Sequence, residues 1–175
     1  MAKELAKEKT TLKNLVTPPH DAETGVHDDH QASLRLWLRI LSCTKVIESR
    51  IRQNLQAKFD TTLPRFDLMA QLDRTPERLT MSELSQRMMV TGGNVTGIAD
   101  CLEKEGLIVR KVDTADRRVV RVELTADGKR QFQRMAAEHE QWVINLFERM
   151  SLKQKKQLSA LLGDLKSHIN RQKGG

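Results

Sequence analysis

Residues 80–128 read "TMSELSQRMMVTGGNVTGIADCLEKEGLIVRKVDTADRRVVRVELTADG" and change their hydrophobic period once. Up to Gly106 the apolar residues recur at the spacing of amphipathic helices, and after it they alternate as in β-strands. Thr80 and Glu83 have the T-x-x-E spacing of a capping box, which marks a helix start. The turn "VTGGN" then leads to a second helix over about 92–105, and Gly106 is a typical stop residue.

The alternating part of this stretch predicts a hairpin. "LIVRKV" and "RVVRVEL" are the expected strands, and the turn-forming segment Asp113–Arg117 joins them. Two short helices with a tight turn, followed by a hairpin, describe a winged helix-turn-helix, whose second helix enters the major groove of DNA. We therefore expect a mainly α fold with a small β-hairpin, and double-stranded DNA as a partner.

Longer helices flank this motif on both sides. Apolar residues at helical spacing predict a long helix over about 30–59, and Pro64 starts a shorter one. After the hairpin we expect a helix over about 126–150. Ser151 and Gln154 have the spacing of another capping box and mark the start of the last helix.

Composition limits the classes of function. The chain has 175 residues and a net charge of +7, which favours nucleic acid or an anionic ligand as partner. Its two cysteines, Cys43 and Cys101, do not have metal-binding spacing. His30 and His139 are expected to be surface or core residues rather than metal ligands. We therefore expect no metal and no cofactor. No stretch approaches the ~18 apolar residues that span a bilayer. The N-terminus lacks the apolar core of a secretion signal, so a cytoplasmic protein is expected.

The start of the predicted second helix is the first candidate DNA contact. Its segment "TGGNVTG" is uncharged, and small residues allow a close approach of the backbone to DNA. Hydroxyl and amide groups can reach bases or phosphates, and a helix N-terminus offers unpaired N–H groups to phosphate. The candidate residues are Thr91, Gly92, Gly93, Asn94 and Thr96. The alternative is that "TGGN" is only a helix-start turn.

The hairpin tip is the second candidate contact. Arg117 and Arg118 follow a cluster of turn-forming residues, at a place that lies beside the DNA backbone and the minor groove. Asp113 and Asp116 can accept hydrogen bonds from turn amides or hold an arginine in one rotamer. The alternative is a solvated turn with ordinary surface charges.

Residues 82–128 resemble the core of the MarR (multiple antibiotic resistance regulator) family, and the resemblance covers about residues 30–170. Its most specific part is a D-x-x-D-R-R…L-T-x-x-G pattern, here Asp113, Asp116, Arg117, Arg118, Leu124, Thr125 and Gly128. The resemblance implies that Arg118 enters the minor groove and that Asp116 orients it. Family wings often read D-x-R-D, whereas Ala115 stands here at the third position, so Arg117 and Arg118 carry more of the contact.

The resemblance also implies a homodimer whose terminal helices interlock below two DNA-reading lobes. We then expect three parts: a flexible N-terminal arm over 1–29, a helical dimerisation region over 30–62 and 126–172, and a winged helix-turn-helix lobe over 63–125. The arm is either a disordered tail or a segment that packs on the partner subunit. Two half-sites would lie about one helical turn apart, roughly 34 Å.

Members of this family commonly release DNA when a small anionic or aromatic molecule binds. "LPRFDLMAQLDR" and "MVTGGNVTG" are similar to the subgroup that senses aromatic acyl-CoA thioesters in aromatic-acid breakdown. Arg35 and Arg39 are four residues apart and share a helix face, so they could meet a CoA phosphate. The candidate ligand residues are Arg35, Trp37, Leu38, Arg39, Leu41, Arg65, Phe66 and Met69. The alternatives are a solvated helix face for the two arginines and an ordinary core position for Trp37.

The sequence thus predicts a dimeric transcriptional repressor that binds a pseudo-palindromic operator. Its expected effector is a hydroxycinnamoyl- or benzoyl-type acyl-CoA, and its expected targets are genes of aromatic-acid catabolism. The alternative is a regulator that responds to a free aromatic acid, a drug or thiol oxidation, although the chain has no tyrosine and both cysteines are expected to be buried. Without a nucleophile elbow or phosphate loop, an enzyme is not expected. A structural partner-binding module would bind no operator.

Overall fold

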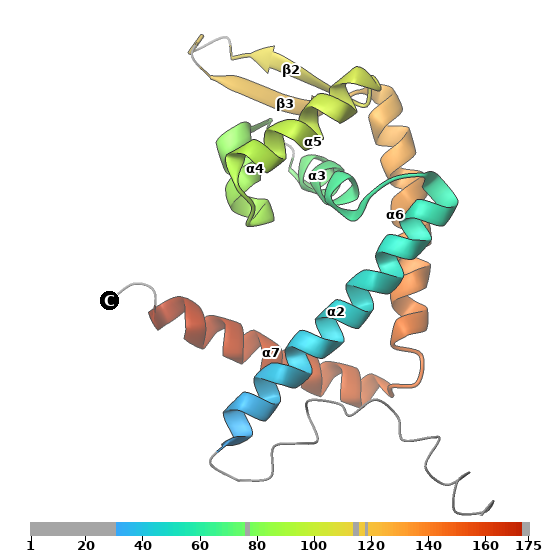
Figure 1. Ribbon diagram of the computed structural model, residues 1–175, viewed down its shortest axis with the longest axis vertical. Helices are drawn as coiled ribbons and strands as arrows, with labels where there is room; N and C mark the ends of the chain where they lie inside the picture. The colour runs from blue at the N-terminus through green and yellow to red at the C-terminus, as the bar shows by residue number, and fades with distance from the viewer. Residues whose placement is uncertain (1–30, 76–77, 114–115, 118, 173–175) are drawn as a thin grey trace, which may run out of the picture. The chain divides into compact units, whose positions relative to one another are not determined.

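The computed structural model of the protein describes residues 31–75, 78–113, 116–117 and 119–172. The chain divides into two units, Met1–Ser49 and Arg50–Gly175. The predicted arm over 1–29 lies outside the described residues. The elements are α2 (Ala32–Phe59), α3 (Leu63–Arg74), β1 (Leu79–Thr80), α4 (Met81–Met88), α5 (Gly92–Lys104), β2 (Ile108–Val112), β3 (Val120–Leu124), α6 (Ala126–Leu146) and α7 (Leu152–Gln172) (Figure 1). The predicted fold class is confirmed.

Local capping signals set the helix boundaries. The Thr80 hydroxyl accepts a hydrogen bond from the Glu83 N–H at 3.2 Å, and the Glu83 carboxylate accepts one from the Thr80 N–H at 2.7 Å. Gly106 has a φ of +71°, a left-handed conformation that favours glycine after a helix. The helix expected to reach Met150 instead ends at Leu146, because a short run of turns precedes the capped start of α7.

The sheet has three antiparallel strands in the order β1-β3-β2, one more than predicted. In the hairpin Ile108 lies opposite Leu124 and Val112 lies opposite Val120. The additional strand β1 pairs through Leu79, which lies opposite Val122. With two residues, β1 is too short to show an alternating pattern in the sequence, and only its pairing with β3 defines it.

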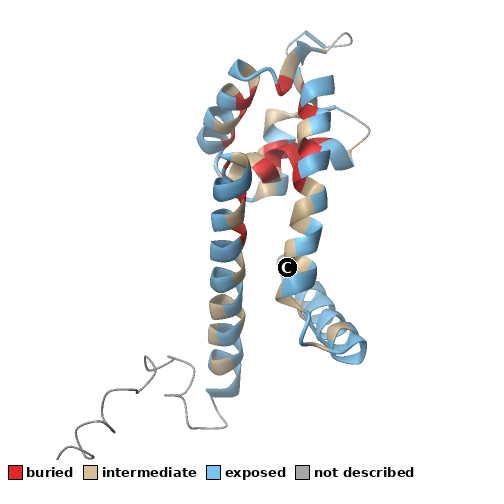
Figure 2. Cartoon of the chain, turned by 90° about the vertical axis from the view of Figure 1, so that its right-hand side faces the viewer, coloured by how far each residue is buried: buried red, intermediate tan, exposed pale blue. Residues whose placement is uncertain are grey.

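The core of the second unit forms where α3 meets α4, α5, α6 and β3. Figure 2 shows the buried residues gathered in these elements. Phe66 of α3 packs on Phe132 and His139 of α6, with ring centroids 5.5 and 4.8 Å apart. The largest fully buried side chains are Leu55, Leu68, Met69, Leu84, Leu102, Ile108, Met135, Val95 and Val122.

The L-T-x-x-G part of the family pattern fastens the base of the hairpin to α6. The Thr125 hydroxyl accepts a hydrogen bond from the Gly128 N–H at 3.0 Å and donates one to the Gly106 carbonyl at 2.7 Å. A Cβ on Gly128 would lie 1.8 Å from the Leu107 carbonyl oxygen, so only glycine fits there. These two residues therefore act in packing rather than in binding.

By contrast, α7 has no buried residue. Its exposed large apolar side chains are Leu152, Leu158, Leu161, Leu162 and Ile169, between 42% and 68% exposed. In the first unit, the exposed large apolar side chains of α2 are Leu34, Leu36, Trp37 and Val46. A stable single chain rarely presents so many large apolar side chains to water.

The packing of His139 predicts a pH-dependent stability. Burial, and to a lesser degree the charge of Arg74, lower the pKa of His139 below its usual 6.5. The native state therefore binds fewer protons than the unfolded chain, so stability is complete above about pH 6.5 and falls as the pH drops toward the folded-state pKa. We expect urea unfolding midpoints to fall between pH 7 and pH 5 in the wild type and to change much less in His139→Gln.

In the range between pH 7 and pH 5, the effect of His139 on stability is separate from the effect of the carboxylates. Hydrogen bonds from Thr80 lower the pKa of Glu83, and a hydrogen bond from Lys111 lowers the pKa of Glu123, so their contributions are lost only below about pH 4.5. An equal pH dependence in the wild type and in His139→Gln would contradict the assignment.

Candidate nucleic-acid interface

Helix α5 buries one face and exposes the other. Val95, Ala99 and Leu102 are fully buried against the core. The predicted DNA contacts Thr91, Gly92, Gly93, Asn94 and Thr96 are all exposed. The structure thus brings these five residues together on one accessible end of α5.

Three glycines reduce the side-chain bulk on the exposed face of α5. A Cβ added at Gly92, Gly93 or Gly97 would meet nothing within 4 Å. Glycine inside a helix costs about 1 kcal/mol relative to alanine. Since no internal contact requires Gly97, its bare backbone suits a close approach from outside the chain.

The first turn of α5 also differs from the starts of α4 and α6. The N-cap residues Thr80 of α4 and Thr125 of α6 accept backbone N–H groups with their side chains. Thr91, the N-cap of α5, makes no such bond. Its hydroxyl and the N–H groups of the first turn therefore lack the side-chain capping of the other two starts, and the positive end of the helix dipole suits a phosphate.

The Thr96 hydroxyl is restricted in what it can recognise. It donates its hydrogen to the Gly92 carbonyl at 3.0 Å. Its oxygen therefore remains an acceptor, which matches the exocyclic amino groups of cytosine and adenine in the major groove.

The hairpin turn places Arg117 in solvent. Arg117 is exposed, and no ion pair or hydrogen bond to its side chain is found among the described residues. Arg118, Thr114 and Ala115 lie outside the described residues, so the predicted contact between Asp116 and Arg118 stays a prediction.

Asp113 anchors the hairpin turn through two contacts. Its carboxylate accepts the Asp116 N–H at 3.3 Å and forms an ion pair with Arg121 Nε. Arg121 also donates from Nη1 to the Arg78 carbonyl at 2.8 Å. Asp113 thus ties the turn to β3 and, through Arg121, to the residue before β1.

The predicted ligand residues fall in different units. Arg35, Trp37, Leu38, Arg39 and Leu41 lie on α2 in the first unit, and Arg65, Phe66 and Met69 lie on α3 in the second. Trp37 is 56% exposed, so it is not a core residue of the single chain.

The α3 members of the ligand prediction have internal contacts. Phe66 and Met69 are buried in the core, and Arg65 forms an ion pair with Glu105 at the end of α5. Whether these eight residues form one ligand site stays a prediction.

Both cysteines correct the expectation of buried thiols. Cys43 and Cys101 are free and exposed. Cys101 is next to the buried Leu102 in sequence, but one helical step of about 100° turns its side chain toward the face of Gly97.

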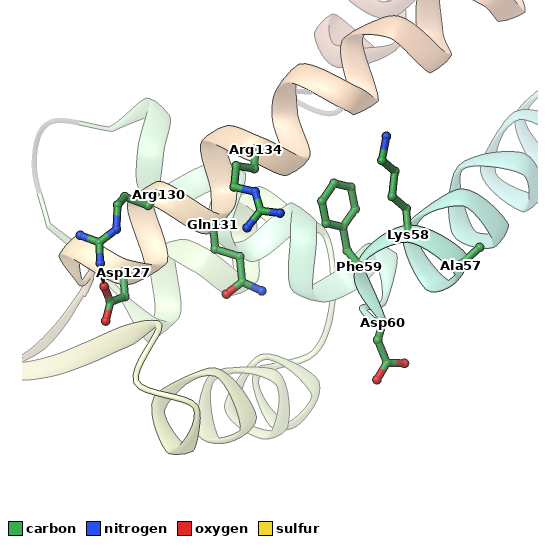
Figure 3. Close-up of a pocket in the computed structure, with 8 residues that line it drawn as sticks. All are labelled: Ala57, Lys58, Phe59, Asp60, Asp127, Arg130, Gln131 and Arg134. Atoms are coloured by element: carbon green, nitrogen blue, oxygen red, sulfur yellow. Dashed lines mark hydrogen bonds and ion pairs between the residues drawn. The ribbon is translucent and has the colours of Figure 1, made fainter.

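A pocket that the sequence did not predict lies between the end of α2 and the start of α6. It has a volume of about 680 Å³ and is lined by Ala57, Lys58, Phe59, Asp60, Asp127, Arg130, Gln131 and Arg134 (Figure 3). Arg130 is turned toward Asp127, with which it forms an ion pair, and Lys58 pairs with Glu138 at 2.6 Å. The only sequence signal was the i, i+4 spacing of Arg130 and Arg134, because the two segments are about 70 residues apart.

The described part of the chain offers neither a metal site nor a membrane span. No group of three or more His, Cys, Asp or Glu side chains there could hold a metal ion. None of the described helices is long and apolar enough to cross a membrane.

Comparisons with known proteins agree with this geometry. The MarR family model matches residues 61–120. The HTH-type transcriptional repressor YetL of Bacillus subtilis is 30% identical over 158 residues, which cover 88% of this chain and 93% of YetL. A MarR family transcriptional regulator from Silicibacter pomeroyi, of known crystal structure, has a TM-score of 0.70 and 30% identity and covers 82% of this chain and 99% of its own.

A structure solved with DNA has the same fold. The Staphylococcus aureus MepR–DNA complex has a TM-score of 0.65 and 22% identity, with 81% of this chain and 99% of that chain covered. The family-model match, the similarity to YetL over most of both chains and the winged helix fold together show that this chain belongs to the MarR family of transcriptional regulators.

Proposed function

We propose that the chain is a dimeric transcriptional repressor that binds a pseudo-palindromic operator and releases it when a small effector binds. One observation carries the DNA-binding part. The exposed face of α5 presents an uncharged first turn and glycines whose missing side chains serve no internal packing. Such a face fits the floor of a major groove, where backbone and short side chains can approach base edges.

The wing supplies the electrostatic part of this proposal. Arg117 projects into solvent at the hairpin turn, and Arg118 follows it in sequence. Arginines at this place neutralise phosphates or enter a narrow minor groove. The MepR–DNA complex supports a DNA-binding role for this fold, and the name of YetL supports a repressor rather than an activator.

The dimer part rests on exposed apolar side chains. The leucines of α7 have no internal partner that buries them, and burying one Leu side chain contributes about 1.5–3 kcal/mol. A two-fold dimer would cover them and set two copies of α5 about 34 Å apart, the spacing of successive major grooves.

For the effector we retain an aromatic acyl-CoA thioester and, as targets, genes of aromatic-acid catabolism. Arg35 and Arg39 of α2 are the expected phosphate contacts, while Trp37, Leu38, Leu41, Phe66 and Met69, with Arg65 nearby, are the expected aromatic site. Release needs only an effector that binds the DNA-free state of the dimer more tightly than the DNA-binding state. A hundredfold loss of DNA affinity corresponds to a coupling free energy of about 2.7 kcal/mol. The alternative effectors are a free aromatic acid, a drug or thiol oxidation.

The wing arginines give the first prediction. A duplex selected by the wild-type protein from a randomised pool serves as operator. Arg117→Ala and Arg118→Ala should each weaken binding and reduce the slope of log K against log salt by about 0.9, the effect of one lost phosphate contact. Fluorescence anisotropy at several salt concentrations measures both quantities. Unchanged affinity and slope in both variants would refute the wing assignment.

Gly97 gives a prediction that separates folding from binding. Gly97→Ala should stabilise the free protein by about 0.5–1 kcal/mol, since alanine favours helix and its Cβ meets no atom of the chain. The alanine methyl group should weaken operator binding, because it would occupy space between α5 and the bound DNA. Thermal unfolding and anisotropy test the two effects, and Gly163→Ala on α7, where a Cβ also meets nothing, is the matched control. Operator affinity equal to wild type would contradict the docking of α5.

The dimer is tested on α7. Leu161→Glu places a charge at a side chain that is 67% exposed in the single chain, so folding should be retained while the dimer is weakened. Light scattering should give twice the 20.0 kDa chain mass for the wild type and a lower mass for the variant. Lys156→Glu, at an exposed residue of the same helix, is the control for added negative charge. A monomeric wild type at micromolar concentration would refute the dimer.

The effector is tested by titrating the operator complex with aromatic acids and their CoA thioesters. We expect thioesters to release DNA at lower concentrations than the free acids. Arg35→Ala combined with Arg39→Ala should weaken this response and leave operator binding intact. Equal potency of acid and thioester would favour the free-acid alternative, and loss of binding after mild peroxide, abolished by Cys43→Ser or Cys101→Ser, would favour oxidation.

A further inference from the structure

Arg110 is a charged residue on the face of the sheet that packs against the helices. It shares this face with Ile108, two residues before it on β2, and it lies opposite Val122 of β3. Ile108 and Val122 are at most 2% exposed. The Arg110 side chain is only 24% exposed and is directed to α5, which contacts β2.

The Arg110 side chain binds three successive sites along α5. Nη1 lies 2.7 Å from Asp100 Oδ1 and 3.1 Å from Glu103 Oε2. Nη2 donates to the Thr96 carbonyl at 3.5 Å, a long contact. The guanidinium therefore spans about two turns of the helix, from the candidate DNA contact Thr96 to Glu103.

Glu103 forms a second link between β2 and α5. Its Oε1 accepts the Arg110 backbone N–H at 3.1 Å, while its Oε2 pairs with the guanidinium. β2 is an edge strand, so this N–H has no partner strand on its outer side. One carboxylate thus holds both the backbone and the side chain of Arg110, which a simple surface ion pair does not do.

The contacts also offset part of the negative charge of α5. Asp100 and Glu103 are the acidic residues of the helix that we propose to insert into DNA. Phosphates would repel both carboxylates. Because Arg110 pairs with both carboxylates, it offsets part of this repulsion.

We propose that Arg110 is a positioning residue that holds α5 and the wing at one fixed spacing, so that the helix and the wing arginines engage the same duplex together. This inference rests on the proposed DNA-binding function. Arg110 does not touch DNA itself. Without Arg110, the spacing between α5 and the hairpin tip is no longer fixed. Docking of α5 on the duplex then no longer brings the wing arginines into place, so the two contacts are less strongly coupled.

The test is a double-mutant cycle on operator binding with Arg110→Ala, Arg117→Ala and the double variant, using the selected duplex. Arg110→Ala should lower affinity about tenfold and change the salt slope by clearly less than one, because no phosphate contact is lost. In the Arg110→Ala background, Arg117→Ala should lower both affinity and slope by clearly less than it does alone. A purely structural role of Arg110 would leave the two effects additive.

Two further variants keep the test informative if Arg110→Ala does not fold. Arg110→Lys keeps the charge but not the two-pronged geometry, and Glu103→Gln weakens both contacts of that carboxylate. Both should show the same non-additivity with Arg117→Ala, with smaller losses. Arg134→Ala on α6 is the matched control and should leave affinity and coupling at wild-type values. Circular dichroism and thermal unfolding confirm that each variant is folded.

The outcomes are distinct. A salt slope reduced by about one in Arg110→Ala would make Arg110 a phosphate contact and overturn the positioning role. Additive losses, or normal binding by Arg110→Ala, would overturn it as well. Failure of the wild type to select any duplex would instead refute the proposed function, while leaving the contacts between β2 and α5 as they are.

Discussion

The burial of Val95, Ala99 and Leu102 fixes the rotation of α5 about its own axis. Since these residues recur every three or four positions, they occupy one side of the helix, and the opposite side must face out. That outer side carries the neutral first turn and Gly97. The direction in which the chain presents its candidate DNA contacts is therefore a consequence of apolar packing against α3 and α4.

The hairpin is fixed from both ends relative to that helix. At its base, Thr125 and Gly128 bring the start of α6 against Leu107. Along β2, Arg110 bonds α5, and near the turn Asp113 bonds Arg121, which reaches the Arg78 carbonyl beside β1. Each ion pair on a solvated surface contributes little by itself. Together they give the hairpin few ways to move independently of α5, which is what simultaneous binding to two grooves requires.

The sequence predicted the features that local chemistry determines. The capping boxes at Thr80 and Ser151 hold because a hydroxyl and a carboxylate or amide three residues apart need no distant partner. Features that depend on distant segments were missed: the strand β1, the pocket between α2 and α6, and the choice of Arg121 as the partner of Asp113. Cys101 was predicted to be buried because its sequence neighbours are apolar, although the helical rotation places it outside.

Chemical interference on a selected duplex tests most directly whether α5 reads the major groove with the wing beside it. Dimethyl sulfate methylates guanine N7 in the major groove and adenine N3 in the minor groove. We predict interference by guanine N7 methylation in two clusters centred about 10 base pairs apart, with adenine N3 interference only flanking them. A single cluster, or interference confined to the minor groove, would contradict the account.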